Sequence, residues 1–234
     1  GGIAYLFALR KLIEEARTDW LAVLEKLELV RGLLINRNAI LCNVTVNAGA
    51  WTQVKPQIDT FLESLPAFDR AMATWSPEHN RAPEGLTLPA NVNYVSKGAS
   101  LFDMNYQRSG ATEVISHYLR STWLWERVRV QGGAYGGFCV FDSHSGTFGY
   151  VSYRDPNVLQ TLDIYDQTAD FLESLELPQE ELEKSIVGTI GSVDAYQLPD
   201  AKGFSAMARR LINYSDEARQ QYRTELLNTT AEDF

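Results

Sequence analysis

The sequence predicts an α+β fold in which a β-sheet carries helices packed on one of its faces. Three observations lead to this prediction. Helical patterns open the chain, four strand patterns with alternating apolar and polar residues follow, and four further helical patterns close it. Strands and helices that segregate along a chain in this way are typical of a sheet with helices on one side.

The first third of the chain reads mainly as helices. Apolar residues recur at three- and four-residue steps over residues 3–17, which predicts a helix. Thr18 or Asp19 stands where a second helix needs its N-cap. Residues 40–46 alternate apolar and polar side chains and predict a half-buried strand. A helix over about residues 52–65 completes this part.

A polar, proline-punctuated stretch interrupts the pattern and predicts a linker over residues 76–90. It separates residues 1–75 from residues 91–234, which we expect to form two domains. The chain starts without methionine, directly in a helical pattern, and we expect it to be part of a longer protein.

The second part alternates strands and helices. Residues 91–97 predict a short strand, and Ser109 can cap a helix that ends at Gly132. Residues 134–142 and 147–153 predict a hairpin. Four helices are then expected to begin near Pro156, Pro178, Pro199 and Ser215, because proline suits the first turn of a helix and serine suits the N-cap.

Composition excludes some classes of function. The chain has 234 residues, 45% of them hydrophobic, and a net charge of −9. An acidic chain lacks the basic surface that nucleic acid requires, and no apolar run reaches the roughly 18 residues of a membrane span. Cys42 and Cys139 lie in strand patterns and are expected to be buried free thiols, with a disulfide between them as the alternative.

The sequence contains no recognisable metal motif. The histidines are His79 in the linker, His117 in the middle of a helix and His144 in the hairpin turn, and none has a second ligand at zinc-binding spacing. No Cys-x-x-Cys pair and no Gly-x-Ser-x-Gly nucleophile motif occurs. We therefore expect no metal site and no nucleophilic serine or cysteine here.

A glycine-rich turn carries the candidate site. Arg129 and Tyr135 stand six residues apart around Gly132 and Gly133, and the glycines leave the surface open. Taken singly, Arg129 could neutralise the end of a helix dipole and Tyr135 could be an ordinary strand residue. Together they can bind a carbonyl or carboxylate group, because a phenol and a guanidinium both donate hydrogen bonds.

Long stretches of the chain resemble the insulinase/pitrilysin-type (inverzincin) zinc peptidases, and within them the presequence protease branch. The resemblance extends over most of the chain. It is carried by four runs of residues in addition to the opening Gly2-Ile3-Ala4-Tyr5: residues 124–136 (LWERVRVQGGAYG), 152–157 (SYRDPN), 161–166 (TLDIYD) and 188–203 (GTIGSVDAYQLPDAKG).

The resemblance implies the C-terminal part of the C-terminal half of such an enzyme. It implies the insulinase/mitochondrial-processing-peptidase-like α+β fold, with residues 1–75 ending the third domain and residues 91–234 forming the fourth. The zinc and its His-x-x-Glu-His motif would belong to the N-terminal half, which would be the partner of this chain. The substrates would be short unfolded peptides such as cleaved targeting presequences.

By match to the family motif, Arg129 would bind the peptide backbone and Tyr135 would act on the scissile carbonyl, with Gly132 and Gly133 beside them. Arg127 is the alternative to Arg129. The expected compartment is the cytoplasm of a bacterium or the mitochondrial or plastid matrix of a eukaryote. Two other functions stay open, a non-catalytic structural or assembly module and a peptide-binding domain without catalysis. The family's zinc motif upstream would argue against the first, and micromolar affinity of this chain alone for a peptide would favour the second.

Overall fold

The computed structural model describes residues 2–69, 74 and 83–234. Of the predicted linker, residues 76–82 lie outside the described residues, and residues 83–90 form no helix or strand. The assignment of the two flanking parts to separate domains stays a prediction.

The chain forms two compact units. One consists of residues 1–82 with residues 198–207, and the other consists of residues 83–197 with residues 208–234. The first unit is built from helices, whereas the second contains the sheet and the larger part of the buried core.

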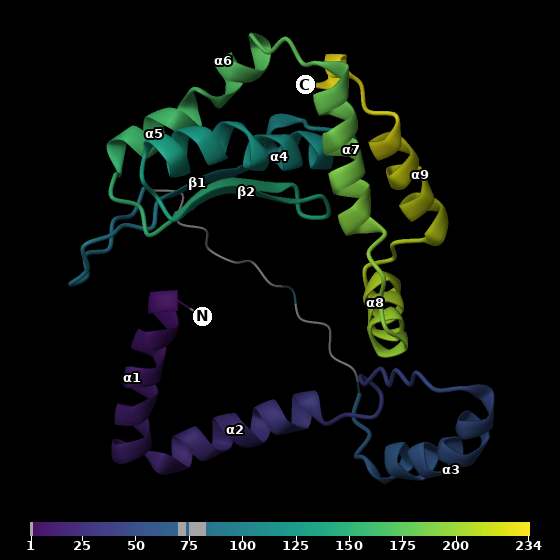
Figure 1. Ribbon diagram of the computed structural model, residues 1–234. Helices are drawn as coiled ribbons and strands as arrows, with labels where there is room; N and C mark the ends of the chain where they lie inside the picture. The colour runs from purple at the N-terminus through teal and green to yellow at the C-terminus, as the bar shows by residue number, and fades with distance from the viewer. Residues whose placement is uncertain (1, 70–73, 75–82) are drawn as a thin grey trace. The chain divides into compact units, whose positions relative to one another are not determined.

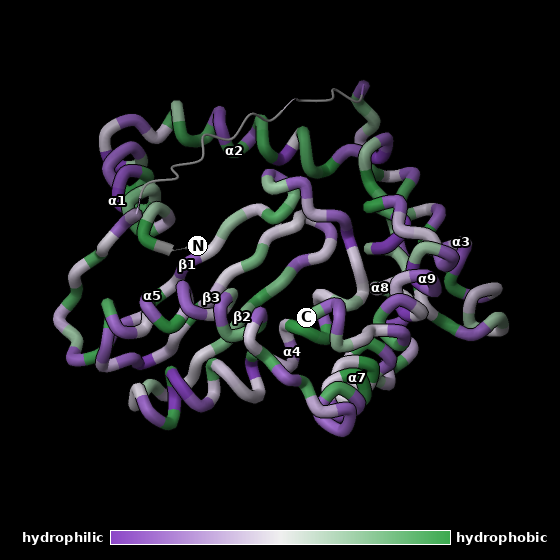
Figure 2. Tube along the Cα trace, turned by 90° about the horizontal axis from the view of Figure 1, so that it is seen from above, coloured by the Kyte–Doolittle hydropathy of each residue, from purple (hydrophilic) through white to green (hydrophobic). Residues whose placement is uncertain are grey.

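The first unit contains α1 (Gly2–Thr18), α2 (Trp20–Leu34) and α3 (Ala48–Ser64). The predicted cap between the first two helices is confirmed, because the Asp19 carboxylate accepts a hydrogen bond from the Ala22 amide at 3.1 Å. Apolar residues recur along both helices (Figure 2), and most of them are exposed in this chain.

The strand predicted over residues 40–46 is wrong, since these residues form no strand. A strand needs a neighbour for its backbone hydrogen bonds, and the described residues of this unit offer none. Cys42 is accordingly exposed rather than buried. The next helix starts at Ala48, earlier than predicted, because the Asn47 side chain accepts from the Ala50 amide at 2.8 Å and caps it.

The sheet of the second unit is antiparallel, with the order β1-β3-β2. Its strands are β1 (Ser96–Ser100), β2 (Gly136–Asp142) and β3 (Thr147–Tyr153). The predicted hairpin is confirmed, with β2 starting slightly later than expected. The strand predicted over residues 91–97 overlaps β1 only at Ser96 and Lys97, and before it Asn93 forms an isolated bridge to Asp155.

The helices of the second unit largely follow the sequence patterns. They are α4 (Ala111–Ser121), the π-helix η2 (Trp125–Gln131), α5 (Leu159–Asp166), α6 (Thr168–Glu173), α7 (Gln179–Val193) and α9 (Asp216–Leu227), while α8 (Pro199–Leu211) continues across the boundary between the units; the short 3₁₀ turns are η1 (Phe102–Met104) and η3 (Ala231–Asp233).

Helix starts were predicted well at three of the four expected positions. Pro178 directly precedes α7, Pro199 begins α8, and the Ser215 hydroxyl accepts from the Ala218 amide at 3.2 Å to cap α9. The helix expected from Pro156 is present, but it begins only at Leu159 and is split into α5 and α6.

The reason for the late start of α5 is local. The Asp155 carboxylate accepts a hydrogen bond from the Asn157 amide at 2.9 Å. This Asx turn holds the backbone after Asp155 out of the helical conformation.

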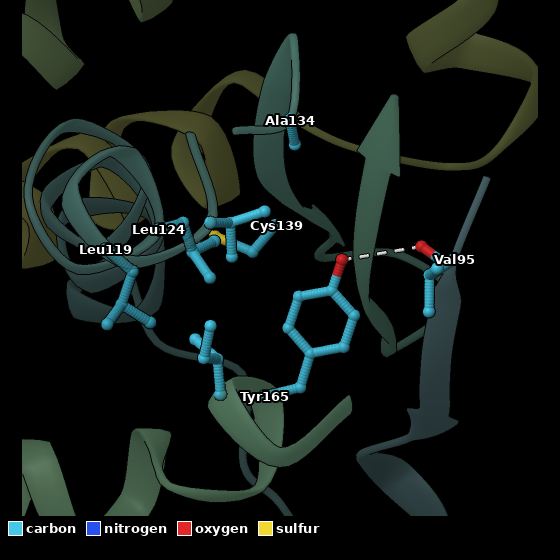
Figure 3. Packing of buried hydrophobic residues seen from close by; sticks show 8 residues of the cluster. Val95, Leu119, Leu124, Ala134, Cys139 and Tyr165 are labelled. Carbon is cyan, nitrogen blue, oxygen red and sulfur yellow. Dashed lines mark hydrogen bonds between the residues drawn. The ribbon is translucent and has the colours of Figure 1, made fainter. Parts of the chain in front are cut away.

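The core of the second unit lies between the sheet and the helices. Figure 3 shows Leu119 and Leu124 facing Cys139 of β2 and Tyr165 of α5. Leu124 is fully buried, and the Tyr165 hydroxyl donates to the Val95 carbonyl at 3.4 Å. Apolar side chains from four segments that are distant in sequence therefore close this core.

The predicted fold class is confirmed. Helices α4 and α5 lie along one face of the sheet (Figure 1). On that face the Cys139 thiol reaches the Ser116 carbonyl of α4 at 3.1 Å. On the other face Phe138 and Val140 are 44% and 52% exposed. Within the described ranges, no helix combines the length and the apolar character that a membrane span requires.

Candidate functional site

The candidate site begins in a π-helix that the sequence did not predict. Helix α4 ends at Ser121 with Thr122 as its C-cap, and after two further helical residues the chain enters η2. Its wider turn is closed by the Gly132 amide, which donates to the Arg127 carbonyl five residues earlier at 3.0 Å. π-Helices are rare and are frequent at functional sites. The only sequence signal in this region was the glycine pair that ends the helix.

The helical stretch places its two arginines on different aromatic rings. The Arg127 guanidinium carbon lies 5.1 Å from the centroid of the Trp123 ring, and that of Arg129 lies 3.9 Å from the Trp125 ring. Trp123 is half-buried and stacks on Phe171 at 4.5 Å, whereas Trp125 is 46% exposed. Trp123 thus belongs to the core and Trp125 to its rim. Arg127 thus packs towards the core, and Arg129 lies on the exposed side.

The turn that follows requires glycine at two positions. A Cβ atom at Gly132 would lie 2.5 Å from the Val128 carbonyl oxygen. Gly133 has a φ of 79°, in the left-handed region that side chains other than glycine rarely adopt. The predicted end of the helix at this pair is confirmed. The glycines shape the turn, and their predicted contact with substrate stays a prediction.

Tyr135 stands directly after this turn, with its side chain 66% exposed. Its amide donates to the Tyr153 carbonyl at 3.1 Å, which fixes its backbone against the end of β3. Its ring meets the Tyr153 ring edge-on with centroids 5.7 Å apart, and Tyr153 meets Tyr94 in the same way at 5.4 Å. Tyr94, Tyr135 and Tyr153 are called the tyrosine row from here on.

Sequence reasoning missed Tyr94 and Tyr153 as neighbours of the site. Tyr153 was visible as the last residue of a predicted strand, but its contact with Tyr135 depends on the register of the hairpin. That register pairs Gly136 with Tyr153. Tyr94 joins the row because residues 93 and 155 form a bridge that brings the chain before β1 to the end of β3.

Arg129 and Tyr135 offer hydrogen-bond donors of two kinds to a ligand. The guanidinium of Arg129 is exposed and makes no ion pair with any side chain in the described part of the chain. A phenolic hydroxyl and a guanidinium can both donate to a carbonyl oxygen, and the guanidinium can also bind a carboxylate in a bidentate manner. These chemistries suit the backbone of a peptide.

The surface hollows of the second unit lie elsewhere. One, of about 600 Å³, is lined mainly by α9 residues and by Ser109 and Ala111. A smaller one is lined by residues between Arg209 and Ser215. Neither of these two hollows includes Arg129 or Tyr135.

The described residues do not fit a metal site. No group of three or more His, Cys, Asp or Glu side chains gathers where it could bind a metal ion within residues 2–69, 74 and 83–234. His117 packs against Gly188 of α7, and the His144 ring meets the Tyr214 ring edge-on at 5.0 Å. His79 lies outside the described residues.

The buried thiol is not a nucleophile. Cys139 is 1% exposed, as predicted, and burial raises the pKa of its thiol to about 11. The thiolate is the reactive form of cysteine, and it is scarcely populated at neutral pH with such a pKa. Both cysteines are free in this structure.

The sequence matches known proteins over most of its length. A family model described as "PreP C-terminal domain" matches residues 83–234. Presequence protease 1, chloroplastic/mitochondrial, of Arabidopsis thaliana is 47% identical over an alignment of 235 positions, which covers 100% of this chain and 22% of that protein. Protein HypA of Clostridium perfringens is 32% identical, with 89% of this chain and 21% of that protein covered. The chain thus spans about a fifth of the length of these relatives.

The fold also matches a solved structure. A protease from Helicobacter pylori superimposes with a TM-score of 0.54 at 18% sequence identity, covering 80% of this chain and 48% of that chain. At this level of identity the match supports the fold.

Proposed function

Because the chain belongs to the presequence protease family through its PreP C-terminal domain, we propose that it is the C-terminal, non-zinc-binding part of a zinc metalloendopeptidase. The whole enzyme would degrade short unfolded peptides such as cleaved targeting presequences. This chain would supply Arg129 and Tyr135 to the chamber that holds the peptide.

The zinc of the full-length enzyme would be held by residues outside this chain. The described residues do not fit a zinc site, because zinc needs three or four His, Cys or carboxylate ligands in close proximity. When bound elsewhere in the enzyme, zinc would supply a water activated for attack on the peptide. The part played by this chain is to bind and orient that peptide.

Tyr135 would be the catalytic residue of this chain. The proposal rests on one observation above all: a glycine turn presents Arg129 and Tyr135 as exposed donors at its two ends. The Tyr135 hydroxyl would donate to the scissile carbonyl oxygen, whose negative charge grows as water attacks. A donor that stabilises this charge lowers the barrier directly.

Arg129 is favoured over Arg127 as the residue that binds the peptide backbone. Its guanidinium lies over the exposed Trp125 ring, and it is itself exposed. Arg127 is half-buried, and its ring partner Trp123 is tied to α5 and α6 by hydrogen bonds to Ile164 and Thr168. Moving Arg127 to a ligand would disrupt that packing.

The proposed partners are the N-terminal catalytic half of the same polypeptide and the peptide substrate, with neither nucleic acid nor a membrane involved. The net charge of −9 favours the binding of basic peptides, and targeting presequences are basic. The proposed compartment is the cytoplasm in a bacterium or the mitochondrial or plastid matrix in a eukaryote.

Replacing Tyr135 with phenylalanine in the full-length enzyme tests the proposal. The variant keeps the ring and its contact with Tyr153 and removes only the hydroxyl. We expect kcat on a presequence peptide to fall by about 100- to 1,000-fold, the usual effect of losing one oxyanion donor. Steady-state kinetics and the thermal unfolding midpoint are measured together, and the midpoint should be unchanged.

Tyr196→Phe is the matched control, because Tyr196 is 82% exposed in the same unit. It should retain the wild-type kcat. A Tyr135→Phe enzyme with the wild-type kcat would remove Tyr135 from the reaction and favour the alternative, a structural or assembly module.

A further inference from the structure

We propose that Asn157 and Asp155, in the loop after β3, are positioning residues for the Arg129–Tyr135 pair. They would hold the glycine turn between the two donors in its working geometry. The inference rests on the function proposed for that pair and assigns a role to the loop that carries Asp155 and Asn157.

Asn157 stabilises the glycine turn through a hydrogen bond to its backbone. Its side-chain amide donates to the Gly132 carbonyl, with 2.6 Å between Nδ2 and the oxygen. Asn157 is half-buried, so water competes poorly for this bond. The bond fixes the peptide plane between Gly132 and Gly133, the point where the chain changes from helical to left-handed backbone.

Asp155 holds Asn157 in place. Its carboxylate is fully buried and accepts two hydrogen bonds, from the Asn157 amide at 2.9 Å and from the Thr161 hydroxyl at 2.8 Å. Its backbone pairs with Asn93 through bonds of 2.7 and 2.9 Å. A buried carboxylate is costly unless it is well hydrogen-bonded, and here both oxygens are used to fix the loop.

The same loop contacts the turn at two further points. Pro156 Cγ would lie 3.6 Å from a Cβ atom at Gly133, so the proline ring packs over that residue. The carbonyl of Tyr153, at the start of the loop, accepts a hydrogen bond from the Tyr135 amide, and the two tyrosine rings meet edge-on. Between these contacts Arg154 has a φ of 49°, an unusual value for a residue with a side chain. The loop therefore holds both Gly132–Gly133 and Tyr135.

Support of this kind matters because the turn itself is weakly constrained. Glycine has access to more backbone conformations than any other residue, and two glycines occupy the turn. Without the Asn157 bond, the chain between Arg129 and Tyr135 would sample several geometries. A displacement of about 1 Å at a reacting group can cost about 100-fold in rate. The bond to Gly132 would thus act on kcat through Tyr135.

The test is a double-mutant cycle in the full-length enzyme between Asn157→Ala and Tyr135→Phe. We expect Asn157→Ala to lower kcat about tenfold with a smaller change in KM, as for a displaced transition-state donor. In the Tyr135→Phe background the same substitution should cost little more, because residues that act as one unit are non-additive. Thermal unfolding midpoints are recorded for all four proteins.

Two further variants complete the design. Asn157→Asp keeps the shape of the side chain, removes the Nδ2 donor and should also lower kcat, which covers the case in which Asn157→Ala fails to fold. Asn91→Ala is the control, because Asn91 is exposed and its side chain makes no hydrogen bond within the described residues.

The outcomes separate the two proposals. If Tyr135→Phe is slow while both Asn157 variants keep the wild-type kcat, the positioning role is wrong and the proposed function stands. An equal fold-loss from Asn157→Ala in both backgrounds also contradicts positioning through Tyr135. If Tyr135→Phe itself has the wild-type kcat, both proposals fail.

Discussion

The two faces of the sheet in the second unit differ in what their side chains do. On the helix-covered face, Cys139 is 1% exposed and Leu124 packs over it fully buried. On the open face, Phe138 and Tyr153 keep 44% and 40% of their surface exposed. The covered face contributes most of the buried core of the unit, while the open face leaves its side chains accessible to solvent.

The π-helix η2 combines a buried and an exposed residue in one short segment. Val128 is fully buried and fills the space left by Gly137 of β2. Arg129 follows it directly and is exposed over Trp125. Neighbouring residues thus lie in the core and on the exposed surface, so substitutions only one or two positions apart should differ in whether they lower stability.

The largest expected difference between the faces is one of stability. Leu124→Ala empties a fully buried site and should lower the free energy of unfolding of the chain by about 2–5 kcal/mol. Phe138→Ala on the open face should cost about 1 kcal/mol, since much of that ring already contacts solvent in this chain. Urea unfolding followed by tryptophan fluorescence measures both. Equal losses would contradict the division between the faces.

A smaller but more specific difference separates the two arginines. In the full-length enzyme, Arg129→Ala should lower kcat/KM for a peptide by about 100-fold, the scale of a lost charge-assisted hydrogen bond in a closed site. Arg127→Ala should leave kcat/KM within about threefold and instead reduce stability by about 0.5–1 kcal/mol, through its lost contact with Trp123. The reverse pattern would assign the peptide to Arg127.

Much of the fold was predictable because its determinants are local. The strand Thr147–Tyr153 has the predicted bounds, and α7, α8 and α9 begin at the predicted prolines and serine. Proline ring geometry and an N-cap hydroxyl act within a few residues, so the sequence displays them directly.

The errors arose where a strand lacks a partner or where a side-chain hydrogen bond competes with the helical backbone. Residues 40–46 alternate like a strand but find no second strand in the described part of the first unit. The helix expected at Pro156 was displaced by the Asx turn at Asp155, whose carboxylate is buried by the surrounding fold.

The site was predictable in part. Arg129, Tyr135 and the glycines stood out because they lie within one short stretch. The choice between Arg127 and Arg129 needed the tryptophan contacts of a π-helix that has no clear sequence signal. The contact between Tyr135 and Tyr153 depends on the register of the hairpin. The Asn157–Gly132 hydrogen bond joins residues that are 25 positions apart in the sequence.

A crystal structure of the full-length enzyme with an uncleaved peptide analogue bound would test most directly whether Tyr135 and Arg129 contact the substrate. The distance to record joins the Tyr135 hydroxyl oxygen to the carbonyl oxygen of the scissile position. We expect about 2.7–3.1 Å, as for an oxyanion donor, with the Arg129 guanidinium on the peptide backbone. A peptide bound in the chamber with Tyr135 and Arg129 both turned to solvent would contradict the roles proposed for these two residues.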